Sequence, residues 1–268
     1  MLVLLPPSEG KTPGGDGPPL GPRPTMSTPA LAAPRAALVA AVRHAAAADP
    51  AALAVGLRLP PGLADAALAA DRAVTRAATR PALDRYAGVV YAALDAGSLS
   101  AAARRRADEQ VLVLSGLWGV VRGGDPVPDY RVPASGSVPG LGRVVAHWRQ
   151  PLAAALPALV GDSVVLDLRS TDYTAMWRPT GAVRARVIAV RVLAERGSGN
   201  ARKVGPVSYH AKWVKGRLAR HLVSSRRRPR TVRDLAAAVA AAAADLDLRV
   251  VDGGTLAAPA FDLVGRYP

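Results

Sequence analysis

The chain opens with MLVLLPPSEGKT (residues 1–12), in which an apolar run stops at two prolines and a polar segment follows. Leu2–Leu5 is a run of apolar residues ended by proline, which predicts a short buried strand. Loops at the carboxyl ends of strands are where α/β proteins usually bind ligands, so Ser8, Glu9 and Lys11 are candidate site residues. The Gly-Lys-Thr at 10–12 is not part of a P-loop, because the other glycine of that motif would fall at Leu5.

Two further polar motifs follow predicted strands. The strand predicted at 111–114 runs into SGLWGVVRGGDPVPDYR (115–131), and the strand predicted at 164–168 runs into RSTDY (169–173). Glycines three positions apart after a strand suit a turn that a ligand approaches, although a structural turn around a packed tryptophan gives the same pattern. In these motifs, the candidates for shaping a cleft are Ser115, Gly116, Trp118, Gly119 and Tyr130. The candidates for binding phosphate are Arg131 and Arg169, and those for acid–base chemistry are Ser170, Asp172 and Tyr173.

A fourth motif, HAKWVKGRLAR (210–220), lies in a helix predicted over 209–223. At about 100° per residue, the apolar side chains of this helix share one arc. The opposite side carries four cations, Lys212, Lys215, Arg217 and Arg220, with Gly216 among them. Glycine inside a helix costs about 1 kcal/mol relative to alanine, and here it would let a phosphate or another backbone approach closely.

The remaining pattern mixes helices and strands without an internal repeat. Helices are predicted at 30–47, 81–94 and 141–159, strands at 183–192, 249–251 and 261–264, and a Gly/Pro-rich loop at 13–29. Within a helical subregion at 50–110, LRLPPGL (57–63) predicts either a helix–hairpin–helix or an ordinary αα-corner. Thr231 and Asp234 have the spacing of a capping box. We therefore expect an α+β fold, a single domain over 1–268 with a mixed β-sheet flanked by helices.

Positive charge is concentrated in one segment. The chain of 268 residues has a formal net charge of +15, with 35 basic and 20 acidic residues. Twelve of the basic residues lie between Arg196 and Arg233, and no acid lies between Glu195 and Asp234. Such a block favours a polyanionic partner, because neutralising phosphates releases counterions. The alternative is a solvated face in a chain made rich in Arg and Ala by a GC-rich genome.

Composition also excludes several classes of protein. The chain contains no cysteine, which excludes disulfide scaffolds, thiolate metal sites and thiol peroxidases. Its four histidines lack metal-ligand spacing, and we expect no cofactor and no metal. The N-terminal apolar run is too short for a signal peptide, and we expect a cytoplasmic protein without a membrane partner.

The order of five motifs resembles the YaaA family of peroxide stress proteins. These motifs are PPSEGKT (6–12), YAGVVYAAL (86–94), LSGLWGVVRGGDPVPDYR (114–131), DLRSTDY (167–173) and HAKWVKGRLAR (210–220). The resemblance implies a single α+β domain with a helix–hairpin–helix-like element, a positively charged cleft, DNA binding and protection against peroxide and unincorporated iron. It also implies that the cleft is lined or shaped by Ser8, Glu9, Lys11, Ser115, Gly116, Tyr130, Arg131, Ser170, Tyr173, Lys212, Lys215 and Gly216.

Two departures from the family pattern bear on the site. Many relatives have a lysine where this chain has Ala175, and a proline where it has Gly123. If that lysine acts in catalysis or phosphate binding, its role is lost here or is taken over by Lys212.

Three functions remain open from sequence. The first is a DNA-binding protein of the peroxide stress response that limits iron-dependent damage by an indirect, non-thiol route, with little base readout. Its phosphate-binding candidates are Lys11, Arg131, Arg169, Lys212, Lys215, Arg217, Arg220 and the arginines of 226–230. The second is an enzyme acting on a nucleotide, nucleobase or small phosphorylated ligand, with catalytic candidates Glu9, Lys11, Ser170, Asp172, Tyr173 and Lys212. The third is a protein-interaction scaffold without chemistry.

Overall fold

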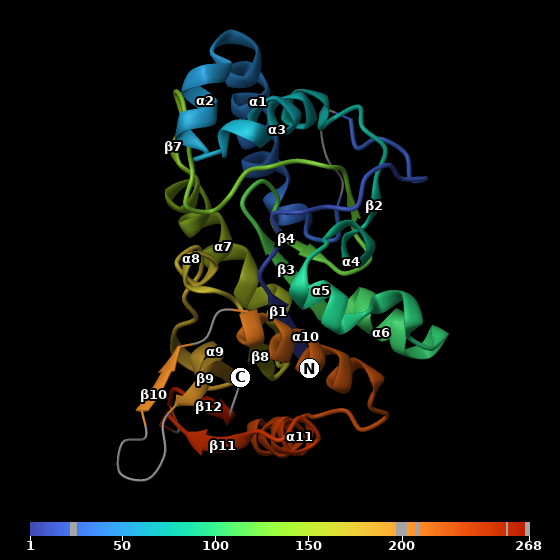
Figure 1. Cartoon of the computed structure of the whole chain (residues 1–268), viewed down its shortest axis with the longest axis vertical. Coiled ribbons are helices and arrows are strands. Elements are labelled where there is room, and N and C mark those ends of the chain that lie inside the picture. Colours follow the sequence, from blue (N-terminus) through green and yellow to red (C-terminus); the bar gives the residue numbers. More distant parts are fainter. Residues whose placement is uncertain (22–25, 197–202, 207–208, 256, 266–268) are drawn as a thin grey trace.

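A mixed β-sheet organises the computed structural model, which describes residues 1–21, 26–196, 203–206, 209–255 and 257–265 (Figure 1). Within these residues an eight-stranded sheet has the order β11-β12-β9-β8-β1-β3-β4, with β10 paired to β9 outside this path. Its strands are β1 (Leu2–Leu5), β3 (Val111–Ser115), β4 (Gly119–Arg122), β8 (Val165–Asp167), β9 (Val187–Arg196), β10 (Lys203–Pro206), β11 (Arg249–Asp252) and β12 (Ala260–Gly265). Two small ladders pair β2 (Arg80–Pro81) with β5 (Pro126–Val127) and β6 (Ser137–Val138) with β7 (Gly142–Arg143).

The strand that opens the chain lies inside the sheet. All four residues of β1 are buried, and β1 pairs in parallel with both β3 and β8. In register, Leu5 lies beside Val113, and Leu4 lies beside Asp167. Parallel pairing brings the carboxyl ends of these strands to one edge of the sheet. The first three motifs therefore leave the sheet at the same edge.

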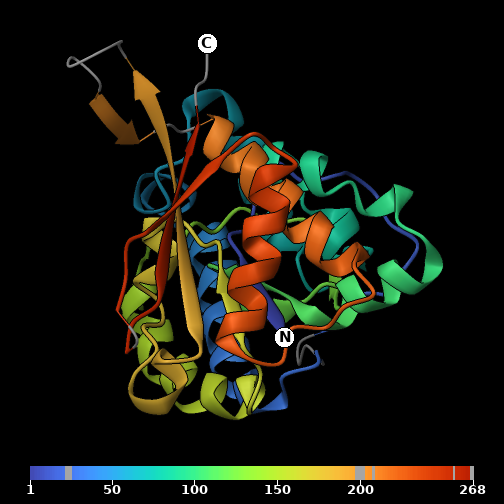
Figure 2. The same ribbon diagram turned by 90° about the horizontal axis from the view of Figure 1, so that it is seen from below.

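Helices flank the sheet, and α10 and α11 lie side by side against it (Figure 2). The helices are η1 (Pro29–Leu31), α1 (Ala32–Ala48), α2 (Pro50–Gly56), α3 (Pro61–Ala73), α4 (Ala82–Arg85), α5 (Val89–Leu94), η2 (Ala96–Ser98), α6 (Ala101–Gln110), α7 (Val144–Val160), α8 (Thr171–Thr174), α9 (Gly181–Arg184), α10 (Tyr209–Ser224) and α11 (Val232–Ala244). The predicted capping box is present. Thr231 Oγ1 accepts a hydrogen bond from the Asp234 backbone N–H, and the Asp234 carboxylate accepts one from the Thr231 backbone N–H. The prediction of a single domain with a mixed sheet flanked by helices is confirmed.

The continuous helix predicted over 81–94 is wrong. The structure has α4 and α5 with a break between them, where Gly88 adopts a φ of 115°. The first motif takes the backbone groups that a continuous helix would use: the Ala87 N–H donates to the Gly10 carbonyl, and the Thr12 N–H donates to the Arg85 carbonyl. The break therefore helps to hold the PPSEGKT loop in place. The strand predicted from residue 183 also begins later, at Val187, because α9 precedes it.

The two helices α2 and α3 meet at an angle of 111°. The N–H groups of Leu57, Arg58 and Leu59 all donate to carbonyls of α2, and Pro60 and Pro61 have no N–H. These three amides are therefore not available to a phosphate, and the helix–hairpin–helix interpretation of this turn is not confirmed. Among the helices in the described residues none is by itself long and apolar enough to cross a membrane; the bent pair α2 and α3 meets that test by length and composition alone.

Candidate functional site

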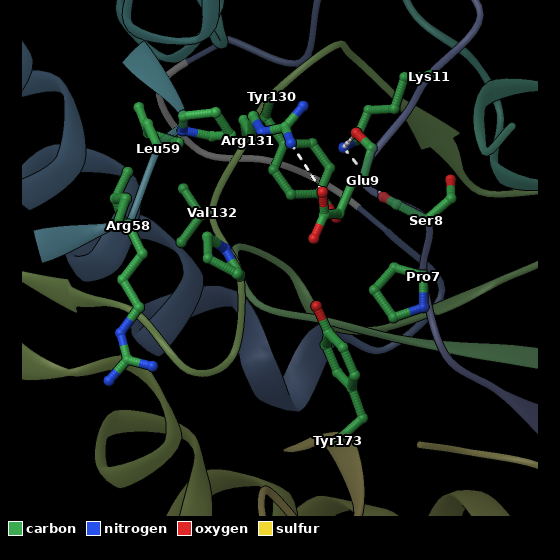
Figure 3. A pocket seen from close by; sticks show the side chains of 13 residues that line it. Pro7, Ser8, Glu9, Lys11, Arg58, Leu59, Tyr130, Arg131, Val132 and Tyr173 are labelled. Carbon is green, nitrogen blue, oxygen red and sulfur yellow. Dashed lines mark hydrogen bonds and ion pairs between the residues drawn. The ribbon is translucent and has the colours of Figure 1, made fainter. Parts of the chain in front are cut away.

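A pocket of about 100 Å³ opens where the first three motifs meet (Figure 3). The loop after β1 supplies Pro7, Ser8, Glu9 and Lys11, the second motif leads into residues 130–133, and α8 supplies Tyr173. Residues 57–60, from the turn between α2 and α3, complete the wall. The sequence predicts that the three motifs contribute to one site, but it does not predict the contribution of residues 57–60. The sequence LRLPPGL has no feature that distinguishes a pocket wall from an ordinary αα-corner.

Lys11 is a pocket cation whose surroundings lower its pKa. Its Nζ lies 4.2 Å from the centre of the Tyr130 ring and 5.8 Å from that of Tyr86. Its hydrogen bonds to the carbonyls of Ser8 and Glu9 are long, at 3.4 and 3.3 Å. Burial lowers the pKa of Lys11 to about 8, with Arg131 and Arg85 acting in the same direction against Asp129 and Asp71. The amine is therefore partly neutral near physiological pH, unlike a lysine on the surface.

Asp71, in α3, is a residue of this region that the sequence analysis did not single out. It is fully buried, its Oδ1 accepts from the backbone N–H of Arg131 at 2.8 Å, and its Oδ2 has no partner within the described part of the chain. Burial raises its pKa to about 6, against the hydrogen bond from Arg131 and the charge of Lys11. In sequence it is one acid in an alanine-rich helix, so only the buried face of α3 identifies it.

Glu9 and Arg131 form an ion pair across the mouth of the pocket. The Arg131 Nη2 lies 2.8 Å from Glu9 Oε2, and the Glu9 side chain is 80% exposed. Such an exposed pair adds little to stability. Water or a ligand can compete for it, so Arg131 is available to an anion that displaces Glu9.

Three hydroxyl groups form a buried chain behind the pocket. Tyr130 Oη lies 2.6 Å from Ser115 Oγ and 2.8 Å from Tyr86 Oη, and Ser115 Oγ accepts from the Trp118 N–H. Burial raises the pKa of Tyr86 to about 12 and that of Tyr130 well above its usual value. The phenols therefore stay protonated and fix the floor under Lys11. Ser115 and Tyr130 are expected from the sequence to shape the site, and Tyr86 is an additional member of this hydroxyl chain.

The glycines of the second motif allow close packing. A Cβ on Gly116 would lie 2.0 Å from the Val132 carbonyl oxygen, and one on Gly119, which has a φ of 73°, would lie 2.6 Å from the Trp148 ring. The side chain of Trp118 is fully buried. These three candidates thus shape the turn that carries residues 130–133 and do not line the pocket, which is the structural alternative for this motif.

The third motif divides between pocket and core. Tyr173 points its hydroxyl into the pocket toward Glu9 (Figure 3), and burial raises its pKa. Ser170 and Asp172 are exposed and outside the pocket lining. Arg169 is buried in a double ion pair with Asp167, at 2.6 and 2.8 Å. Its remaining amino group donates to carbonyls of Tyr173 and Trp177, so this arginine has no free donor edge for a phosphate.

None of the α10 cations lines this pocket. Lys215 donates to the Arg169 carbonyl at 2.9 Å, which places it behind the third motif. Arg220 donates to the carbonyls of Leu94 and Asp95. Lys212 and Arg217 are exposed on the outer side of the helix.

Gly216 explains the orientation of α10, because a Cβ there would lie 2.2 Å from the Val90 carbonyl oxygen of α5. The sequence predicts that Gly216 lets either a phosphate or another backbone approach closely, and in the structure the backbone of α5 does so. In the described part of the basic segment, the α10 cations therefore lie outside the PPSEGKT pocket.

Arg58 is the charged residue among the pocket-lining residues 57–60, which sequence reasoning missed. It is exposed, lines the pocket and has a φ of 55°, a conformation that L-residues other than Asn and Asp adopt rarely. It makes no side-chain hydrogen bond or ion pair within the ranges that the structure describes. The pocket thus contains three basic side chains, Lys11, Arg58 and Arg131, and one acidic side chain, Glu9.

Comparison with known proteins places the chain in a family. Residues 1–242 match the family described as "Peroxide stress protein YaaA". A UPF0246 protein of Streptomyces coelicolor is 46% identical over 225 residues, which is 84% of each chain. A UPF0246 protein of Corynebacterium efficiens is 38% identical over 242 residues, 88% of this chain and 90% of the relative. The motifs, the fold and these matches agree, and the chain belongs to the peroxide stress protein YaaA family.

Proposed function

We propose that this protein binds DNA during peroxide stress and limits iron-dependent damage by an indirect route that uses no thiol. Membership of a family named for peroxide stress supports the physiological part. The absence of cysteine from the chain removes a thiol peroxidase as the mechanism. The observation that carries DNA binding is the exposed cationic surface of α10 and the linker to α11.

This cationic surface comprises Lys212 and Arg217 on α10 and the exposed arginines that follow it: Arg226, Arg227, Arg228, Arg230 and Arg233. Its arginines after α10 make no ion pair with an acidic side chain in the described ranges. Unpaired surface arginines keep all their donors for phosphate oxygens. A long run without acids also has no carboxylates to repel a polyanion.

Two exposed aromatic residues border the cationic surface. Tyr209 is 63% exposed and Trp213 is 41% exposed, four residues apart on α10, and the Arg217 guanidinium lies 5.7 Å from the Trp213 ring. Exposed rings among cations are the usual platform for unpaired bases. The small number of aromatics in the chain suggested little base contact, but these two are placed for stacking. We therefore propose that the surface prefers DNA with unpaired bases over a perfect duplex.

The α2–α3 corner is not assigned a DNA contact in this proposal. The amides of Leu57, Arg58 and Leu59 donate to carbonyls of α2, so the corner would offer few donors to a phosphate backbone. The proposal therefore rests on the exposed cationic surface of α10 and its following linker, and not on the basic cleft that the family resemblance implies.

A pair of charge-matched variants tests the proposal. Arg226, Arg227 and Arg228 are replaced by Gln in one protein, and the exposed Arg143, Arg149 and Arg178 are replaced by Gln in the control. The first variant should bind a fluorescent oligonucleotide at least tenfold more weakly than the parent, and the control should differ little. Equal losses in the two variants would mean that net charge alone, and no particular surface, accounts for binding.

A second function, an enzyme acting on a small ligand, is supported by the pocket. Lys11 and Asp71 have pKa values of about 8 and about 6, on opposite sides of neutrality, which is the pattern of acid–base sites. Tyr173 adds a protonated hydroxyl and Arg131 a cation. DNA phosphate binding on the α10 surface does not require any of these four groups.

A further inference from the structure

The PPSEGKT pocket contains one amine with the surroundings of a covalent nucleophile. The Lys11 Nζ faces the Tyr130 ring, and its two hydrogen bonds to backbone carbonyls are long. Neither an aspartate nor a glutamate forms an ion pair with it in the described chain. An amine that is desolvated in this way and has no carboxylate within salt-bridge distance is typical of lysines that attack carbonyl carbons.

The same pocket has a surplus of positive charge for its ligand. Within the described residues, Arg58 lines it with no side-chain hydrogen bond or ion pair, and the acidic partner of Arg131 is the exposed Glu9. Arg58 also keeps a left-handed backbone that glycine would adopt more easily. Strain retained at a pocket wall by a cationic residue points to a role for that side chain in binding.

We propose that Lys11 forms an imine with a small carbonyl compound that carries a carboxylate or phosphate group, and that Arg58 and Arg131 bind this anionic group. The pocket volume of about 100 Å³ suits a small ligand or the small reactive end of a larger one. This activity deepens the small-ligand function above and is independent of DNA binding by the α10 surface.

The reaction is balanced without an oxidant or a reductant. The Lys11 nitrogen adds to the carbonyl carbon, the π electron pair moves to oxygen, and one proton passes from nitrogen to that oxygen. The resulting carbinolamine loses its hydroxyl group and the remaining nitrogen proton as water, which leaves a carbon–nitrogen double bond. The Tyr173 hydroxyl points into the pocket toward Glu9 (Figure 3), and in this proposal it donates a hydrogen bond to the oxygen as it departs.

The charged groups around Lys11 set when its amine is neutral. Asp71 and Asp129 stabilise the ammonium form, and Arg131 and Arg85 oppose it, in addition to burial. A lysine whose pKa is about 8 has roughly two hundredfold more neutral amine at pH 7.5 than an ordinary surface lysine. Imine formation should therefore reach half of its maximal rate near pH 8.

The four lysines of the chain make a clean test possible. The whole protein is incubated with glyoxylate, an anionic aldehyde, and cyanoborohydride, which reduces an imine to a stable secondary amine. Peptide mass spectrometry then compares the rate at Lys11 with the rate at the exposed Lys212. Labelling of Lys11 should be at least tenfold faster, and it should disappear from Lys11→Arg while Lys212 is labelled as before.

An uncharged aldehyde of similar size, glycolaldehyde, tests the anion-binding part. Glyoxylate should label Lys11 faster than glycolaldehyde does, and Arg58→Gln should remove this preference without changing the labelling of Lys212. Equal rates at Lys11 and Lys212 would overturn the imine, and equal rates with the two aldehydes would overturn the anionic ligand. Oligonucleotide binding of the same variants reports separately on the DNA function, which Lys11→Arg should leave intact.

Discussion

The Asp71 Oδ1 accepts a hydrogen bond from the backbone N–H of Arg131 at 2.8 Å, although the two residues are 60 positions apart in the chain. This contact joins helix α3 to the end of the second motif. It aligns Arg131 beside Glu9 and brings a buried carboxylate near Lys11. Helix α3 thereby becomes part of a site whose other residues follow the strands of the sheet.

Replacing Asp71 with Asn should change how stability depends on pH. The pKa of Asp71 is about 6 in the folded state and 3.8 in the unfolded state. The stability that the protonated carboxyl contributes is therefore fully present below about pH 4 and is lost as pH rises through 6. A shift of about two units corresponds to about 3 kcal/mol. The stability of Asp71→Asn relative to the parent should therefore rise by up to this amount between pH 4 and 6. If the free energies of unfolding of the two proteins, measured with denaturant, differed by the same amount at every pH from 4 to 6, the assignment would be contradicted.

Gly216→Ala should destabilise the protein despite the better helix propensity of alanine. The new Cβ would lie 2.2 Å from the Val90 carbonyl oxygen and 2.7 Å from the Ala93 Cβ, so α10 must move away from α5. Overpacking of this kind costs about 1–3 kcal/mol. Gly62→Ala, in α3, is the matched control, because nothing lies within 4 Å of its Cβ, and it should be neutral or stabilising by up to about 1 kcal/mol. Thermal unfolding of the two variants separates close packing from helix propensity.

Tyr130→Phe should cost more stability than Tyr86→Phe. Tyr130 is the central hydroxyl of the buried chain, and its loss leaves the hydroxyls of both Ser115 and Tyr86 without their shared partner. Each buried polar group left without a partner costs about 1–3 kcal/mol. Tyr86→Phe removes only a terminal hydroxyl of the series, so the hydrogen bond between Tyr130 and Ser115 remains. The free energies of unfolding in urea should follow this order, and the reverse order would show that the hydroxyl chain is not what orders the pocket floor.

Arg58→Gly should stabilise the protein and weaken its binding of an anionic ligand. Glycine adopts the φ of 55° without the penalty that arginine bears, which is worth up to about 1 kcal/mol. The same change removes a cation from the pocket, so the preference of Lys11 for glyoxylate over glycolaldehyde should fall. Arg58→Ala is the control, since it removes the cation and keeps the strained backbone. A melting temperature that rises equally in the two variants would mean that backbone strain at residue 58 is negligible.

The strands were predictable because their patterns are local. Leu2–Leu5 and the run that begins at Val111 are apolar segments bounded by turn residues, and both are buried strands of the sheet. Their parallel order places the starts of three motifs at one edge, so the grouping of Lys11 and Tyr173 follows from topology, whereas Tyr130 lies farther along the chain, after β4 and β5.

What sequence could not reveal depends on contacts between distant segments. The break after Arg85 arises because Gly10 and Thr12 take hydrogen bonds there, and no periodicity of 81–94 contains that information. Arg169 resembles a phosphate ligand in sequence, but Asp167, two residues earlier, occupies its guanidinium. Gly216 lies among cations in sequence, yet the side of α10 that it occupies is set by α5.

The most direct test of the proposed DNA function is the salt dependence of oligonucleotide binding between about 50 and 200 mM salt. For the parent protein, the logarithm of affinity should fall steeply and linearly with the logarithm of salt concentration, because each neutralised phosphate contributes a slope of about 0.7–0.9. The variant with Gln at 226, 227 and 228 should show a slope shallower by about 2, and the variant with Gln at 143, 149 and 178 should keep the parental slope. A parental affinity that hardly changes with salt, or equal slopes in all three proteins, would contradict DNA binding by the α10 surface and its following arginines.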